Sequence, residues 1–328
     1  MKTLAYSLII GLLFAGCGSK QYFEPEDTQG DYHAQEQNLG SDIKTFNNDG
    51  ATLENNKFIS KDGISSFSLK EGYSFINSND GVVLAANDEG SLLIINGNKE
   101  EEIKFDKNIV SASIKGDLLA LGFFDNSIII YDKAAKQIKY KEYFAESMIN
   151  DIKIANPKFM ETVLLFPTLD GKVVIIDLNK KSVIQTINID PESEINNIIF
   201  LDTIDDTLIT ATPSRIFTFT NGNVKVIDID IKNIIVHGSF IYVATVDGWI
   251  IKYNYNLLEL AKLKFKFAKF HSLGFGTSLY ALESQGYMIK MNEFLTEHEI
   301  LDFSFDEDEK VIMINNKIYF ENSSIELK

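Results

Sequence analysis

Pairs of short apolar runs recur along most of the chain, from residue 57 to the C-terminal end. In each pair a short turn rich in Asp, Asn and Gly joins the two runs, which predicts a β-hairpin. The runs are continuously apolar rather than alternating, as expected for strands that are packed on both faces. Seven turn residues mark the repeat at steps of 30 to 45 positions: Gly90, Asn126, Gly171, Ser214, Gly248, Gly286 and Asn316.

The repeat period indicates the architecture. A more polar strand flanks each hairpin, for example residues 181–189, so each repeat supplies four strands. Four strands per repeat of about 38 residues are typical of a β-propeller blade. We therefore expect an all-β propeller of seven blades over residues 57–328. Residues 57–67 are either an eighth hairpin or a strand that closes the ring against the C-terminal segment. A helical solenoid, the competing architecture, is disfavoured by the density of β-branched residues.

The first 16 residues have the pattern of a secretory signal peptide. Lys2 and the amino terminus are positive, and residues 4–14 are apolar apart from Ser7 and Gly11. This stretch is too short for a bilayer span, which needs about twenty residues.

Phe14, Ala15 and Gly16 precede Cys17, which is the only cysteine of the chain. These four residues resemble the lipobox of bacterial lipoproteins, and the resemblance implies cleavage before Cys17 and acylation of its thiol. An ordinary cleaved signal with a chance cysteine is the alternative. An aspartate after the cysteine would imply retention in the inner membrane, whereas Gly18 implies an outer-membrane protein facing the periplasm.

Residues 17–56 are polar and show no sustained period of two or 3.6. A segment with so few apolar residues does not recover the entropy cost of ordering, so we expect a flexible tether that spans roughly 35 Å. In an alternative interpretation, Tyr22, Phe23, Tyr32 and Phe46 dock on a partner.

The chain is acidic, with 31 Lys and Arg against 47 Asp and Glu. Removal of residues 1–16 takes one lysine and no acid, which changes the formal charge from −16 to −17. This charge argues against nucleic-acid binding, which requires basic residues to neutralise phosphates. With Cys17 acylated, no disulfide, catalytic cysteine or cysteine-based zinc site is expected. No later apolar run approaches eighteen residues.

Few residues carry candidate chemistry. The four histidines, His33, His237, His271 and His298, lack metal-site spacing, and we interpret them as structural. The glycines of residues 274–281 precede a strand rather than a helix, which argues against a dinucleotide site. Residues 77–81 and 302–309 carry acidic groups with the wrong glycine spacing for a calcium loop. We expect no catalytic, cofactor-binding or metal-binding residues.

Residues 261–270 alternate lysine with apolar side chains, so Lys262, Lys264 and Lys266 should share one strand face. This pattern fits an outer strand protected against aggregation, and a basic stripe for an acidic partner is the alternative. Trp249, the only tryptophan, is interpreted as a packed turn residue rather than part of a binding face.

Two propeller families resemble the repeats. Residues 169–187 are similar to the last two strands of a WD-type repeat, with Asp177 at the position of its terminal aspartate and Asp132 in the matching place of the preceding repeat, although the Gly-His signature is absent. The lipobox, polar segment and full-length propeller together resemble PQQ-type propellers, particularly the BamB-type lipoproteins. That resemblance implies a scaffold for the outer-membrane β-barrel assembly machinery.

Two classes of function follow. The first is a non-catalytic, lipid-anchored scaffold that docks on an envelope protein complex, with β-barrel assembly as the first candidate and a respiratory or flagellar assembly as the next. The second is a propeller enzyme, either a lactonase-like hydrolase or a quinoprotein. Histidines and carboxylates that converge at the ring centre would favour the enzyme, whereas an apolar patch on one rim would favour the scaffold.

Overall fold

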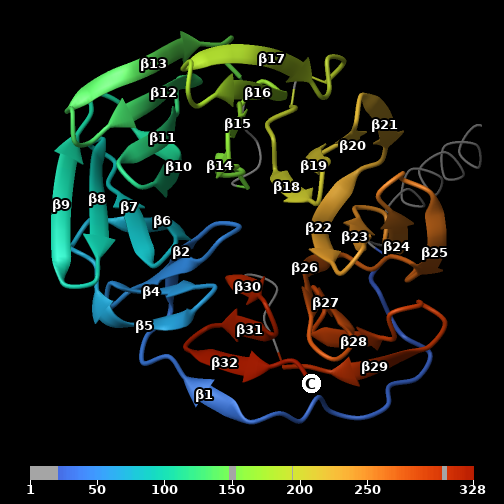
Figure 1. Ribbon diagram of the computed structural model, residues 1–328. Helices are drawn as coiled ribbons and strands as arrows, with labels where there is room; N and C mark the ends of the chain where they lie inside the picture. Colours follow the sequence, from blue (N-terminus) through green and yellow to red (C-terminus); the bar gives the residue numbers. More distant parts are fainter. Residues whose placement is uncertain (1–20, 148–152, 194, 305–308) are drawn as a thin grey trace, which may run out of the picture.

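The computed structural model describes residues 21–147, 153–193, 195–304 and 309–328. Phe14, Ala15, Gly16, Cys17 and Gly18 therefore lie outside the described residues, and the lipobox stays a sequence prediction. The described part forms eight four-stranded antiparallel sheets, arranged as the blades of a ring (Figure 1). The expected all-β propeller is confirmed.

Seven blades each consist of four strands that are consecutive in the chain. Their strands, from inner to outer, are as follows: blade 1, β2 (Ile43–Phe46), β3 (Ala51–Leu53), β4 (Lys57–Ser60) and β5 (Gly63–Ser68); blade 2, β6 (Ser74–Asn79), β7 (Val82–Ala86), β8 (Ser91–Asn96) and β9 (Lys99–Lys104); blade 3, β10 (Ile109–Lys115), β11 (Leu118–Phe123), β12 (Ser127–Asp132) and β13 (Gln137–Tyr143); blade 4, β14 (Lys158–Phe159), β15 (Val163–Pro167), β16 (Lys172–Asp177) and β17 (Ser182–Asn188). The remaining three are blade 5, β18 (Phe200–Ile204), β19 (Thr207–Thr212), β20 (Arg215–Thr220) and β21 (Asn223–Asp228); blade 6, β22 (Ile231–His237), β23 (Phe240–Thr245), β24 (Trp249–Asn254) and β25 (Glu259–Lys264); and blade 7, β26 (Phe270–Phe275), β27 (Leu279–Glu283), β28 (Tyr287–Met291) and β29 (His298–Asp302).

The eighth blade joins the two ends of the described chain. Its inner strands are β30 (Val311–Ile314), β31 (Lys317–Phe320) and β32 (Ser323–Glu326), and its outer strand is β1 (Glu36–Asn38). β1 pairs antiparallel with β32, with Gln37 opposite Ser324. The ring is thus closed by backbone hydrogen bonds between segments almost 300 positions apart.

The ring has eight blades rather than the seven that the repeat first suggests, so the alternative with an eighth hairpin is confirmed. Residues 57–68 form the outer hairpin of blade 1, which is the eighth hairpin that the sequence left open. They do not close the ring, since β1 does. The repeat pattern did not reveal blade 1, because its inner strands β2 and β3 have only four and three residues and contain no long apolar run.

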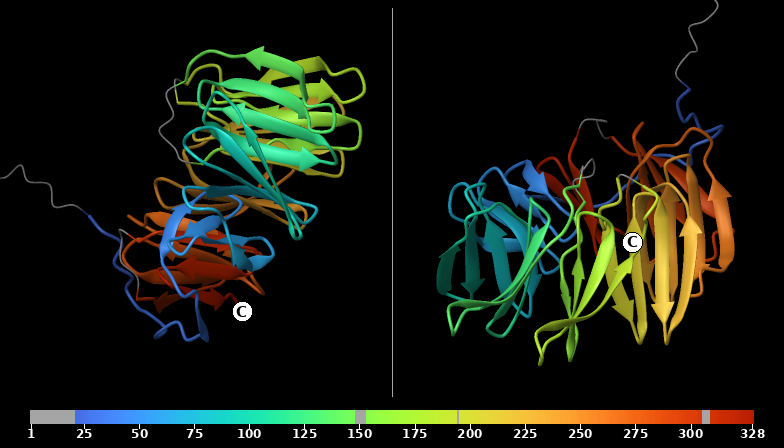
Figure 2. Two further views of the ribbon diagram at one scale, coloured as in Figure 1. Left: turned by 90° about the vertical axis from the view of Figure 1, so that its left-hand side faces the viewer. Right: turned by 90° about the horizontal axis from the view of Figure 1, so that it is seen from above.

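The expected flexible tether over residues 17–56 also needs correction, because β1, β2 and β3 lie within it. Its first described residues pack along the outside of blades 7 and 8 (Figure 2). Phe23 is 6% exposed, with its ring 5.6 Å from that of Tyr287, and the ring of Tyr32 lies 6.1 Å from that of Phe303. This segment is ordered by a few isolated aromatic side chains that pack on the ring and by backbone pairing with the last blade. Its polar composition gives no sign of these contacts.

The continuously apolar runs are the middle strands of the blades, as their pattern predicts. β27 is buried at all five positions because neighbouring blades cover both of its faces. The hydrophobic core is correspondingly divided into clusters between adjacent blades. One of them packs Leu84 and Leu92 of blade 2 against Leu119 and Leu121 of blade 3.

Glycine is required at the tight turn between β23 and β24. Gly248 has φ +90°, and a Cβ there would lie 2.4 Å from the carbonyl oxygen of Phe265. We expect Gly248→Val to lower the free energy of unfolding by about 2–3 kcal/mol through backbone strain and this clash. Gly222→Val is the control, because Gly222 has φ +83° but no atom within 4 Å of the added Cβ. Urea denaturation measures the free energy of unfolding of both variants. An equal decrease for the two would contradict the role of the clash with Phe265.

Candidate functional site

The centre of the ring is a channel that both polar and apolar residues line. The inner strands of most blades enclose a cavity of about 540 Å³. Its polar lining is rich in asparagine and includes Asn77, Asn79, Asn156, Asn233 and Asn315.

A loop between β2 and β3, residues 47–50, extends into this channel from blade 1 (Figure 1). Asn48 Nδ2 donates to the carbonyl oxygen of Ile199 beside blade 5, at 2.8 Å. Asn156 Nδ2, from the segment that leads into blade 4, donates to Asp49 Oδ2 at 2.7 Å. The loop therefore bridges the channel and bonds to blades on its far side.

An ion pair and a buried carboxylate lie in the channel. Lys158 Nζ and Asp202 Oδ1 form an ion pair. Burial raises the pKa of the Asp49 carboxyl, and the hydrogen bond from Asn156 opposes the rise. These contacts hold neighbouring blades and the bridging loop together.

The four histidines lie in different parts of the ring. His271 lines the channel, whereas the His33 side chain is 86% exposed in the N-terminal segment. His237 stacks on Phe275 at 3.6 Å between ring centroids, and His298 lies in the outer strand β29. Within the described ranges, no three His, Cys, Asp or Glu side chains are grouped as a metal site.

The remaining candidate motifs serve packing. Gly274 and Gly276 allow the chain to approach Leu327, since a Cβ at either position would come within 3.0 Å of it. Asn77, from the acidic segment 77–81, donates to the Ala112 carbonyl oxygen and joins blades 2 and 3. The other acidic segment, 302–309, is described only in part.

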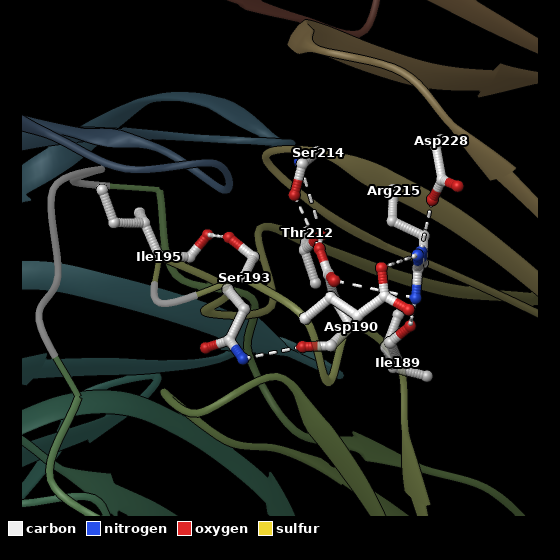
Figure 3. A network of polar contacts seen from close by, with 10 residues as sticks. Ile189, Asp190, Ser193, Ile195, Thr212, Ser214, Arg215 and Asp228 are labelled. Carbon is white, nitrogen blue, oxygen red and sulfur yellow. Dashed lines mark hydrogen bonds and ion pairs between the residues drawn. The ribbon is translucent and has the colours of Figure 1, made fainter.

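Arg215 is the only arginine of the chain, and its ion pairs hold the long connection between blades 4 and 5 in place (Figure 3). Its guanidinium lies 3.6 Å from Asp190 Oδ1 and 2.6 Å from Asp228 Oδ1. Asp190 is 3% exposed and accepts hydrogen bonds from Thr212 and Ser214, at 3.1 and 2.6 Å. The network fixes the connection whose later residues bond to the bridging loop.

A second buried carboxylate lies at the end of β27. Glu283 is 0% exposed and accepts backbone hydrogen bonds from Lys269 and Gln285, at 3.0 and 2.7 Å. Burial raises the pKa of its carboxyl above the ordinary value.

This raised pKa predicts a pH dependence of stability. The folded state binds the proton of Glu283 more tightly than the unfolded state, so its contribution to the free energy of unfolding increases as pH falls from above the folded pKa toward 4.5. Glu283→Gln removes this contribution. The stability of wild type relative to the variant should therefore rise on acidification, as measured by urea denaturation. A relative stability that falls or stays constant over this pH window would contradict the assignment.

An aromatic patch lies on the rim of blade 3. We define the blade 3 patch as Phe124 and Tyr143 with Lys107 and Lys141. Phe124, in the turn between β11 and β12, is 66% exposed, and Tyr143, at the end of β13, is 59% exposed. The ammonium groups of Lys107 and Lys141 each lie 4.9 Å from the centroid of the Tyr143 ring. Lys107 also forms an ion pair with Asp125, the residue that follows Phe124 in the chain.

The sequence did not indicate this patch, because Phe124 directly follows the apolar residues 118–123, which form the buried strand β11. The signal was present in the adjacent pair Phe123 and Phe124. The turn residues Asp125 and Asn126 follow directly, so β11 ends at Phe123 and Phe124 lies beyond the two strand faces that neighbouring blades cover. Phe123 is 4% exposed and Phe124 is 66% exposed.

The lysine-rich segment 261–270 is only partly a strand. Lys262 and Lys264 are exposed on β25, as the alternation predicts, but β25 ends at Lys264. Lys266 and Phe267 instead lie in the connection to blade 7. Trp249 is half-buried at the start of β24, and the ammonium group of Lys264 lies 4.9 Å from its ring centroid.

No helix among the described residues is long and apolar enough to cross a membrane.

Comparison with known proteins reveals distant relatives and a shared fold. No protein-family model matches the chain. The plasminogen-binding protein PgbB of two Helicobacter pylori strains is 27% identical to it, over 89% of this chain and 63% of PgbB. The chain thus spans less than two thirds of the curated relatives that it matches.

Solved structures show the same fold at low sequence identity. BamB from Moraxella catarrhalis matches 90% of this chain with a TM-score of 0.66 at 14% identity, and 99% of BamB is covered. The C-terminal WD40 domain of Sif2 matches 90% with a TM-score of 0.65 at 11% identity, and Sqt1 of Saccharomyces cerevisiae matches 91% with 0.61 at 13%; these matches cover 99% and 98% of the two chains. The chain is a β-propeller that is structurally similar to BamB and distantly related to PgbB.

Proposed function

We propose that this protein is a non-catalytic scaffold that binds a protein partner through the blade 3 patch. In this proposal acyl chains on Cys17 hold it at the outer membrane, facing the periplasm. The observation that carries the proposal is the exposure of Phe124 and Tyr143 on one rim, 66% and 59%.

The chemistry of the patch suits protein binding. Large aromatic side chains at the centre of an interface supply most of the binding energy in many complexes. Lys107 and Lys141 add cationic groups beside the Tyr143 ring, and Lys141 has no ion-pair partner among the described residues. The partner surface should therefore combine apolar groups with carboxylates.

Two partners are supported by different observations. The BamB-like fold and the lipobox support an envelope protein complex, with the β-barrel assembly machinery as the first candidate. The name of the PgbB relatives supports plasminogen as the second. This chain covers 63% of PgbB, so the binding activity of the whole relative is a proposal for the matched part.

Crosslinking in intact cells tests the first partner. A photoreactive amino acid in place of Phe124 should capture the subunits of an envelope complex, as identified by mass spectrometry. The same group in place of Leu258 is the control, because Leu258 is 61% exposed in a turn at the opposite end of the strands. Equal capture at both positions would contradict the assignment of the blade 3 patch, and reproducible turnover without any partner would contradict the scaffold.

Binding to purified plasminogen tests the second partner. If plasminogen is the partner, the full chain should bind immobilised plasminogen, and Phe124→Ser with Tyr143→Ser should weaken that binding. Absence of binding, together with capture of an envelope complex in cells, would exclude plasminogen and leave the scaffold in place.

A further inference from the structure

A second exposed patch lies where the N-terminal segment joins the ring. Val246 is 59% exposed in the turn between β23 and β24, and Phe267 is 37% exposed in the connection from β25 to β26. The two loops lie side by side, because the backbone N–H of Phe265 donates to the carbonyl oxygen of Gly248 at 2.9 Å. We call Val246, Phe267, Lys266 and Lys269 the blade 6 patch.

The backbone holds Phe267 outward in an unusual conformation. Its φ is +68°, in the left-handed region that large side chains rarely adopt. Positions of this kind are often retained for function rather than for stability. Lys266 and Lys269 flank it and are exposed, and neither forms an ion pair with another described residue. The patch thus joins apolar groups to unpaired cations on an otherwise acidic chain.

The N-terminal segment brings the lipid anchor to this patch. The ring of Phe23 packs edge-on against that of Phe265, with 6.2 Å between centroids, two positions before Phe267. Cys17 and Phe23 are only six positions apart in the chain, so their α-carbons are at most about 21 Å apart. Tyr22, adjacent to Phe23, is itself 45% exposed.

We propose that the blade 6 patch contacts the surface of the bilayer that holds the acyl chains of Cys17. This inference depends on the acyl anchor of the proposed function but not on the protein partner. The short link keeps blade 6 near the headgroups, where aromatic and apolar side chains enter the interface while lysines extend toward phosphates. Blade 3 is three blades away from blade 6 around the ring of eight, so a ring tilted onto blade 6 leaves the blade 3 patch free for a partner (Figure 1).

The single tryptophan makes this contact measurable. In a Trp249→Phe background, Phe267→Trp places one fluorophore in the patch. Leu258→Trp places it in the same blade, in the turn between β24 and β25 at the other end of the strands. The acylated full chain of each variant is reconstituted in vesicles of phosphatidylethanolamine and phosphatidylglycerol, with or without bromine on the acyl chains.

The proposal predicts loss of most of the emission of the Phe267→Trp chain in brominated vesicles and none for the Leu258→Trp chain. If neither chain is quenched although both float with the vesicles, or both are quenched equally, the blade 6 contact is refuted while anchor and scaffold remain. If mass spectrometry finds no acyl group on Cys17 and the chain does not float with the vesicles, both the anchor and this contact are refuted. In none of these cases does the result alter the crosslinking test of the blade 3 patch.

Discussion

Replacing Asp190 by alanine is expected to lower the free energy of unfolding by about 3 kcal/mol. Asp190 is 3% exposed, and its carboxylate accepts from Thr212 and Ser214 beside the guanidinium of Arg215. Removal of one partner from a buried ion pair costs about 3–5 kcal/mol, because the remaining charge loses its compensation. The lower end applies here, since Arg215 keeps its contact with Asp228.

Asp228→Ala is the matched control, because Asp228 pairs with the same guanidinium but its side chain is 72% exposed. An exposed pair contributes at most about 1 kcal/mol. Chemical denaturation of the two variants measures both effects. If the Asp190 variant is no less stable than the Asp228 variant, the network around Arg215 does not stabilise the fold as proposed.

Replacing Gly50 by alanine should also cost about 3 kcal/mol, at the upper end of the usual cost of overpacking. A Cβ at Gly50 would lie 2.1 Å from the carbonyl oxygen of Ile59 and 2.4 Å from the ring of Phe75. The bridging loop would have to move, and with it the contacts of Asn48 and Asp49 across the channel.

Gly81→Ala is the control for this second prediction. Gly81 has φ +77° and no atom within 4 Å of an added Cβ, so it reports backbone strain alone, about 1 kcal/mol. Thermal or urea denaturation compares the two variants. A Gly50→Ala protein as stable as wild type would show that the loop does not bridge the channel as described.

The repeated hairpins were predictable because each middle strand is buried on both faces. Residues 82–86, for example, are apolar at every position, and all but the first are buried between two blades. The eighth blade was not predictable in the same way. β2 and β3 are short, and β1 joins its blade through backbone hydrogen bonds that most side chains permit.

The candidate sites were harder to infer than the fold. Lys252, in the middle of β24, is 3% exposed, with its ammonium group 3.7 Å from the Phe240 ring centroid and 3.0 Å from the Glu293 carbonyl oxygen. An exposed Phe124 and a buried Lys252 both oppose the average preference of their residue type. Only the three-dimensional neighbours decide such positions, and sequence pattern alone does not supply them.

The affinity of the partner captured through Phe124 tests the central claim most directly. We expect Phe124→Ser with Tyr143→Ser to weaken binding to that partner by about 30-fold or more, equivalent to about 2 kcal/mol. Leu258→Ser with Leu260→Ser is the control pair, since these residues are 61% and 46% exposed on blade 6. The account predicts a large loss for the first pair and an unchanged dissociation constant for the second. Equal dissociation constants for wild type and the Phe124 and Tyr143 double variant would contradict it.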